Sequence, residues 1–460
     1  MRRWKVALVV AIAGAAIVAG LVLYNKYAES DMRSELYIPQ KERITPEIQL
    51  LQQYVRIETL DGRELPGARF LATLLEKDGV KPEIIESAPG RASVYARIKG
   101  RKSGEGLLLL NHIDVMPADA KEWQRPPFSG AIYLNQLWGR GALDMKSIGL
   151  AELDAFLTVA RTHRMPERDL VFLAVAGEEE GGMWGTGWLV QHRPDIFEGI
   201  RYALNEGGIT EMKEETLTYF GVEVGTKMDV RVRLRAASRE QMERVRIALE
   251  PSITPRDPDR VLPAVAEYLH DIAPHRMEIG GLLDDVSRTI AQGKFWLLPR
   301  GYKELMQNVV WTVGAQTDAR GATLDVNMYN LPDENPDGRI AWLKSIVTPL
   351  GATVEEVLVK NGPAPISSTK TPLFNLIVRE AHAQYGPVPV GPEILAGSGN
   401  DSRFLRSRGI TAYGLSPFRV DYFQSLGIHS ANERIRLDWY LGGVQLMRRL
   451  VSAAVFSPLS

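Results

Sequence analysis

The stretch LLLLNHIDV (107–115) places four leucines directly before a histidine and, two residues later, an aspartate. A short continuous apolar run is typical of a strand that is buried on both faces. A second run, over 170–176, leads into the acidic loop GEEEGG (177–182), and a helical pattern over 148–162 separates the two runs. Strands that alternate with helices predict an α/β domain with a mainly parallel sheet. The polar residues follow the strand ends, where such sheets place their sites.

The pattern changes near residue 225. Val230, Val232 and Leu234 alternate with arginines, which is typical of a strand with one buried and one wet face. We therefore predict an α/β domain in two pieces, with an inserted α+β module between them. The predicted ranges are 1–30 for an N-terminal segment, 31–221 and 363–460 for the α/β domain, and 222–362 for the inserted module.

The composition of the chain limits the kinds of partner and of metal ligand that it can have. The 460 residues exceed one compact core, and a net charge of −1 gives no indication of a nucleic-acid partner. The chain has no cysteine, which excludes disulfides, thiol catalysis and thiolate metal ligands. Histidine, aspartate and glutamate remain as side chains that can hold a metal.

The N-terminus carries an uncharged run, VALVVAIAGAAIVAGLVLY (6–24), after Arg2, Arg3 and Lys5. Its 19 residues could cross a hydrocarbon core of about 30 Å as a helix. The preceding positive charges would keep the tail in the cytoplasm and export the rest. The sequence thus predicts a single-pass transmembrane helix (1–30) that anchors the chain in a lipid bilayer, with the α/β domain on the periplasmic or lumenal side. A cleaved signal peptide is the alternative.

Acids and imidazoles recur in order along the chain. They are His112 and Asp114 after the first strand, Asp144 in a glycine-rich loop, Glu178 and Glu179 after the second strand, Glu206 in NEGG, and His429 in GIHS. Each could be structural alone: Asp144 as a helix cap, the glutamates as a solvated turn. Together they supply two imidazoles and enough carboxylates for two metals about 3.5–4 Å apart with one bridging carboxylate. Asp114 could accept the second N–H of the His112 ring.

These blocks resemble the di-zinc family of aminoacylases, carboxypeptidase S and glutamate carboxypeptidases, and are most similar to carboxypeptidase S and the fatty-acyl amino acid hydrolases. The matching blocks are NHIDV (111–115), PPFSG (126–130), LWGRGALDMKS (137–147), GEEEGG (177–182), NEGG (205–208), GNDSRF (399–404) and GIHSANERI (427–435). The resemblance covers nearly everything after residue 45.

The resemblance implies a zinc-peptidase-like fold and a role for each residue. His112, Asp144 and Glu179 would hold one zinc, and Asp144, Glu206 and His429 the other. Manganese or cobalt would also suit these ligands. Asp114 would be the orienting acid, Glu178 the general base, and Asp401 and Arg403 substrate-proximal residues. The α/β domain (31–221 and 363–460) would be the catalytic domain, and the inserted α+β module (222–362) would be the family's lid, which covers the site and could also form a homodimer.

Two departures matter. Gly177 stands where the family has Asp, so the register could shift to Glu179 as base and Glu180 as ligand. The lid lacks the family's Gly-His-Ser segment, its Asn-x-x-Pro segment and an Arg, whose place Tyr329 takes. The candidates to supply the missing hydrogen-bond donors to the substrate are Arg239, Arg320 and Tyr329.

The sequence predicts a membrane-anchored di-zinc hydrolase that cleaves an amide bond of a small peptide or an N-acyl amino acid. A metal-bearing binding protein without catalysis, and a di-metal esterase or deacetylase, are the alternatives.

Overall fold

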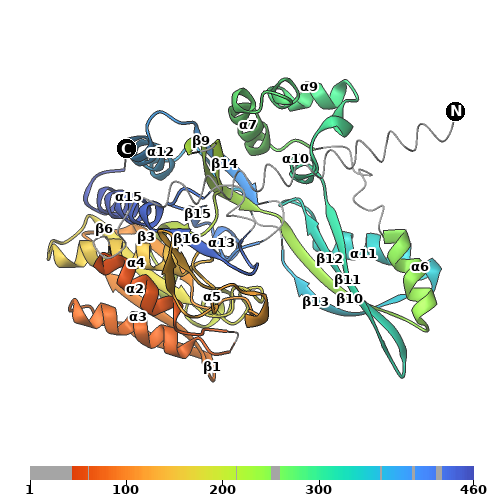
Figure 1. Cartoon of the computed structure of the whole chain (residues 1–460), viewed down its shortest axis with the longest axis horizontal. Coiled ribbons are helices and arrows are strands. Elements are labelled where there is room, and N and C mark those ends of the chain that lie inside the picture. The colour runs from red at the N-terminus through yellow and green to blue at the C-terminus, as the bar shows by residue number, and fades with distance from the viewer. Residues whose placement is uncertain are drawn as a thin grey trace.

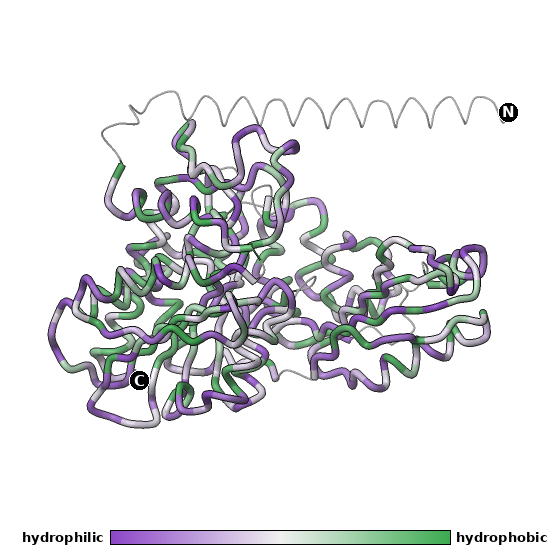
Figure 2. The backbone as a smooth tube through the Cα atoms, turned by 90° about the horizontal axis from the view of Figure 1, so that it is seen from below, coloured by the Kyte–Doolittle hydropathy of each residue, from purple (hydrophilic) through white to green (hydrophobic). Residues whose placement is uncertain are grey.

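The structure is a computed structural model and describes residues 44–459 except 61, 214, 250–259, 363–364, 396–398 and 421–426. A large mixed sheet with helices on both faces forms one body, and a four-stranded sheet with two helices lies beside it (Figure 1). Segments of hydrophobic residues lie inside the larger body (Figure 2).

Among the described residues, nine strands form the large sheet, in the order β1-β2-β6-β3-β7-β15-β9-β14 with β8 paired to β9. Their bounds are β1 Glu83–Ala88, β2 Arg91–Ile98, β3 Lys102–His112, β6 Arg168–Val175, β7 Ile200–Asn205, β8 Thr210–Lys213, β9 Thr216–Thr226, β14 Val390–Leu395 and β15 Thr411–Gly414.

The prediction of a mainly parallel sheet is wrong, because the sheet is mixed. The central pairs β6–β3, β3–β7 and β7–β15 are parallel, and so is β9–β14. The pairs β1–β2, β2–β6, β8–β9 and β15–β9 are antiparallel. Short connections set two of these directions: β1 and β2 are joined by two residues, and so are β8 and β9, which is too few for the crossover that parallel strands need.

Successive leucines of β3 enter opposite layers. Leu107 and Leu109 pack in the core under one set of helices, and Leu108 and Leu110 in the core under another. The first set is α2 Pro46–Val55, α3 Leu65–Lys77, α4 Lys146–Arg161, α12 Pro372–Tyr385 and α15 Leu437–Phe456; the second is α5 Thr186–His192, α13 Ser402–Arg406 and the 3₁₀ helix η3 Pro194–Phe197. Burying each leucine contributes about 1.5–3 kcal/mol, which explains the unbroken apolar run.

The four-stranded sheet has the order β11-β12-β10-β13. With α6 Arg239–Leu249 and α11 Pro336–Val347 it forms what we call the lid module; its strands are β10 Met228–Ala236, β11 Val309–Asp318, β12 Gly321–Asn330 and β13 Thr353–Lys360. Val230, Val232 and Leu234 are buried against the helices, as the alternation predicts. The chain enters this sheet directly from β9, with only Lys227 between the two strands.

A group of short helices separates the two halves of the lid module along the chain. These are α7 Pro263–Ile272, α8 Gly280–Leu283, α9 Val286–Ala291 and α10 Arg300–Glu304. Val265, Leu269 and Val286 belong to the core of the large body and not to that of the lid module. The boundaries 31–221, 222–362 and 363–460 stay a prediction.

A small sheet joins two distant loops. β16 Arg434–Arg436 pairs with β5 Gln136–Trp138, which pairs with β4 Ala131–Tyr133. Its register places Arg434 opposite Trp138 and so brings the segment after His429 beside the segment before Asp144.

The prediction of a transmembrane helix is not supported and is corrected. In the part of the chain that the structure describes, no helix is long and apolar enough to cross a membrane. The longest, α15, carries Asp438, Arg448 and Arg449 and is packed in the core. Residues 6–24, on which the prediction of a bilayer contact depended, lie outside the described residues. The predicted membrane span and the predicted periplasmic or lumenal localisation are therefore not supported.

Candidate metal centre

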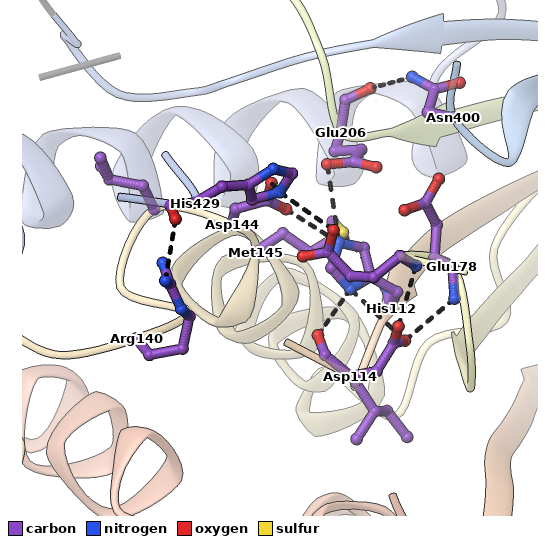
Figure 3. Close-up of polar contacts among 12 residues, drawn as sticks. His112, Asp114, Arg140, Asp144, Met145, Glu178, Glu206, Asn400 and His429 are labelled. Carbon is purple, nitrogen blue, oxygen red and sulfur yellow. Dashed lines mark hydrogen bonds and ion pairs between the residues drawn. The ribbon is translucent and has the colours of Figure 1, made fainter. Parts of the chain in front are cut away.

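Three neighbouring strands deliver three of the predicted ligands to one edge of the sheet. His112 ends β3, Glu179 follows β6, and Glu206 follows β7, and these strands are adjacent in the order β6-β3-β7. Asp144 precedes α4, and His429 comes from the loop before β16. Figure 3 shows the two imidazoles and the carboxylates of Asp144, Glu178 and Glu206 converging.

The five side chains form two groups that share Asp144. His112, Asp144 and Glu206 present ligand atoms within 4.8 Å of one another, and so do Asp144, Glu179 and His429. Asp144 Oδ1 lies 2.9 Å from His112 Nε2, and Asp144 Oδ2 lies 2.9 Å from His429 Nε2. One carboxylate therefore faces both groups.

This grouping corrects the pairing that the resemblance implied. Glu179 lies 3.0 Å from His429 Nε2, and Glu206 lies 3.7 Å from His112 Nε2. The two glutamates are exchanged relative to the expectation. Strand adjacency does not decide between the two glutamates, because β6 and β7 both flank β3.

Asp114 lies against the imidazole that it is predicted to orient. Its backbone carbonyl accepts the hydrogen bond from His112 Nδ1 at 2.9 Å, and its carboxylate Oδ1 lies 3.6 Å from the same nitrogen. The hydrogen bond leaves Nε2 to face Asp144 and Glu206. The Asp114 carboxylate also accepts the backbone N–H groups of Glu178 (3.1 Å) and Glu179 (3.0 Å). Asp114 thus fixes both the imidazole and the acidic loop.

The acidic loop adopts the first of the two registers. Glu179 belongs to a ligand group, whereas Glu180 is half-exposed and bonds Arg91 at 2.9 Å. Glu178 is 9% exposed and lines the adjoining cavity. Burial raises the pKa of the Glu178 carboxyl well above its usual range, and the charges of Glu206 and Asp401 add to the effect.

A buried ion pair that the sequence reasoning missed braces the site. Arg140 Nη1 donates to Glu433 Oε2 at 2.6 Å, and Nη2 donates to the carbonyl of His429 at 3.0 Å. The other Glu433 oxygen accepts the N–H groups of Leu143 (2.7 Å) and Asp144 (3.2 Å). Arg140 and Glu433 lie in two blocks that resemble the family, LWGRGALDMKS and GIHSANERI. Their separation in the sequence gives no indication that they form a pair. Together they hold the Asp144 loop against the His429 loop.

The charges of the site suit divalent cations. Burial raises the pKa of Glu206 to about 7, with the charge of Asp144 adding to this. Burial lowers the pKa of His429, but its hydrogen bonds to Asp144 and Glu179 outweigh burial and raise the pKa to about 10. Glu179 Oε1 is buried without a hydrogen-bond partner. Imidazoles and carboxylates with an unsatisfied buried oxygen fit two ions such as Zn²⁺, Mn²⁺ or Co²⁺.

A cavity of about 600 Å³ opens beside these groups and reaches the lid module. Its lining includes Asp229, Arg231 and Tyr329 from the lid module and Arg403 from the large body. Of the three candidate hydrogen-bond donors, Tyr329 lines this cavity, and Arg239 and Arg320 do not. Arg231 was missed, because in the alternating strand it is indistinguishable from its neighbouring arginines.

The two predicted substrate-proximal residues differ in position. Arg403 lines the cavity and donates to the carbonyls of Asn400 (2.7 Å) and Gly181 (2.7 Å). Asp401 is buried and does not line it. Its carboxylate lies against Gly182, where a side chain would collide with it. Asp401 therefore supports the acidic loop from behind.

Residues 108–453 match the model of peptidase family M20/M25/M40. The chain belongs to this family. The predicted family and the enzyme class, a metallopeptidase or amidohydrolase, are confirmed at this level. The match contains all five ligand candidates.

Individual relatives are more distant. The chain is 26% identical to aminoacylase-1B of Rattus norvegicus, over 91% of this chain and 97% of the relative. It is 33% identical to a probable succinyl-diaminopimelate desuccinylase of Staphylococcus aureus, but spans only 32% of that relative's length. The solved structure of the di-peptidase Dug1p of Saccharomyces cerevisiae has a TM-score of 0.70 at 14% identity, covering 93% of this chain and 98% of that one. This likeness supports the fold alone.

Proposed function

We propose that this M20-family protein is a two-metal hydrolase that cleaves the amide bond of a small peptide or an N-acyl amino acid. One observation carries the proposal: each oxygen of Asp144 faces a different imidazole at 2.9 Å, and Glu178 lines the cavity beside them. His112, Asp144 and Glu206 would hold one ion, and Asp144, Glu179 and His429 the other. Zinc is the ion that we propose, with manganese and cobalt as alternatives.

The bound ions would polarise the scissile carbonyl and lower the pKa of the attacking water. Glu178 takes the proton from that water and passes it to the leaving amine. Its buried position suits this role, because burial favours the carboxyl form that must deliver the proton. Asp114 holds the Glu178 backbone and so fixes where this carboxylate lies.

The cavity wall indicates how a substrate would be held. Arg231 Nε lies 2.8 Å from Asp229 Oδ2, which orients the guanidinium beside Tyr329. The Arg403 guanidinium is already engaged with two carbonyls. We assign Arg231 as the group that meets the carboxylate of the substrate, because it lies on the lid side of the cavity wall and its contact with Asp229 is made through Nε. Apolar lining from Leu143, Ile148, Phe418 and others would receive an apolar acyl group or side chain.

The test begins with the metal content of the purified protein. Cleavage of N-acyl amino acids, dipeptides and matched esters is then followed by mass spectrometry, before and after chelation. Glu178→Gln should keep both metals and lose about 10²–10⁴-fold in turnover. Glu180→Gln, two residues on in the same loop, is the matched control. Wild-type turnover in Glu178→Gln would refute the assigned base.

The binding-protein alternative makes a different prediction. It requires two bound metals without cleavage of any compound in the panel. Faster cleavage of esters than of amides would favour the esterase alternative. A homodimer through the lid module stays a prediction, which sedimentation would test.

A further inference from the structure

Behind the metal centre, a fully buried carboxyl and a fully buried amide lie against each other. Asn111 Nδ2 donates to Glu152 Oε2 at 2.9 Å. Neither side chain is exposed to solvent. Asn111 precedes His112 at the end of β3, and Glu152 lies on α4, two turns after Asp144.

The remaining two oxygens of this pair are both acceptors without a donor. Asn111 Oδ1 and Glu152 Oε1 are buried and lack a hydrogen-bond partner. Within the part of the chain that the structure describes, the charge that acts on Glu152 is that of the Glu206 carboxylate, which repels an ionised form. An ionised carboxylate here would be unpaired in the interior, which is strongly unfavourable.

We propose that Glu152 is held as a neutral carboxylic acid in a two-hydrogen-bond pair with the Asn111 amide, and that this pair positions His112 against Asp144. The acid O–H donates to Asn111 Oδ1, and Asn111 Nδ2 donates to Glu152 Oε2. Both unsatisfied oxygens are thereby satisfied. Burial raises the pKa of Glu152 well above its usual range, in agreement with the neutral form.

A glycine in the middle of α4 supports this pairing. Gly149 occupies the helix one turn before Glu152, where glycine is unfavourable. A side chain at this position would come within 2.9 Å of Asn111 Oδ1. The helix thus leaves room for the amide at the point where the acid meets it.

The position of the Asn111–Glu152 pair indicates its structural role. His112 and Asp144 belong to one ligand group but come from different elements, β3 and the start of α4. The pair joins these elements directly behind the two ligands. Loss of such supporting contacts typically lowers metal affinity about 10–100-fold. Asn111 and Glu152 are therefore positioning residues and contact no substrate.

The inference rests on the proposed metal centre, and the test separates the two. Zinc affinity is measured by competition with a coloured chelator, without substrate, on the full chain. Glu152→Gln restores both hydrogen bonds as an amide pair and should keep wild-type affinity. Glu152→Met, of similar length, should lose about 10–100-fold. Asp154→Asn, on the same helix but paired with Arg448 near the surface, should keep wild-type affinity.

Infrared difference spectroscopy tests the neutral acid independently. The wild-type protein should show the carbonyl stretch of a protonated carboxyl, absent from Glu152→Gln. Wild-type affinity in Glu152→Met, or equal losses in Glu152→Gln and Glu152→Met, would overturn the proposal. So would absence of the band, which remains a test should Glu152→Met fail to fold. If the wild type binds no zinc, the metal centre fails, and the band still reports on the pair.

Discussion

Replacing Glu433 by alanine should destabilise the protein more than the loss of any surface ion pair. The Glu433 side chain is 0% exposed and that of its partner Arg140 is 3% exposed. The change removes the partner of a buried guanidinium and leaves the N–H groups of Leu143 and Asp144 without an acceptor. Breaking a buried pair in this way costs about 3–5 kcal/mol.

The measurement is urea denaturation, read as a fall in midpoint at unchanged slope. Glu83→Gln is the matched control: Glu83 meets Arg193 at 2.7 Å but its side chain is 49% exposed, so the cost should be about 0–1 kcal/mol. Replacing both partners, as Arg140→Met with Glu433→Leu, should cost less than Glu433→Leu alone, because no uncompensated charge remains. Equal midpoints for Glu433→Ala and Glu83→Gln would refute the reasoning.

Two further predictions concern binding and pH. Arg231→Ala should weaken binding of substrates with a free carboxylate by about 1.5–3 kcal/mol, read as a rise in KM, and should not affect their amides. Arg233→Ala, two residues along the strand and paired with Asp325 outside the cavity, is the control; an equal rise in KM for both variants would contradict the assignment. Burial raises the pKa of Glu393 from 4.5 to about 8, so the folded protein retains a proton there that the unfolded chain releases, and stability should fall as pH rises through that range. Glu393→Gln should flatten this part of the pH profile of the urea midpoint, and an unchanged profile would show that Glu393 does not titrate in this range.

The sequence predicts which residues form the site, but not which glutamate lies beside which histidine. His112, Glu179 and Glu206 each follow an apolar run, and parallel central strands bring those ends together. Which glutamate faces which histidine is not decided by strand order, because β6 and β7 both flank β3. It depends on contacts between loops that lie far apart in the chain, such as those of Asp144 and His429. The exchange of Glu179 and Glu206 is therefore invisible in a linear pattern.

Other features escape the sequence for different reasons. Apolar periodicity does not depend on the direction in which a strand runs. It therefore gives no sign that β2 is antiparallel to β6, or that β9 is antiparallel to β15. Arg231, Arg233 and Arg235 share one alternating pattern, but only the first lies close enough to the large body to line the cavity. Arg140 and Glu433 are 293 residues apart, and no spacing rule connects them.

The helices α7–α10 have a consequence for exchanging parts between relatives. They come between α6 and β11 along the chain but pack on the large body, so the lid module consists of two separate chain segments. A chimera that carried a relative's lid sheet would need four junctions, two for each segment. A transplant cut once before β10 and once after β13 would also replace helices that complete the core of the recipient's larger body.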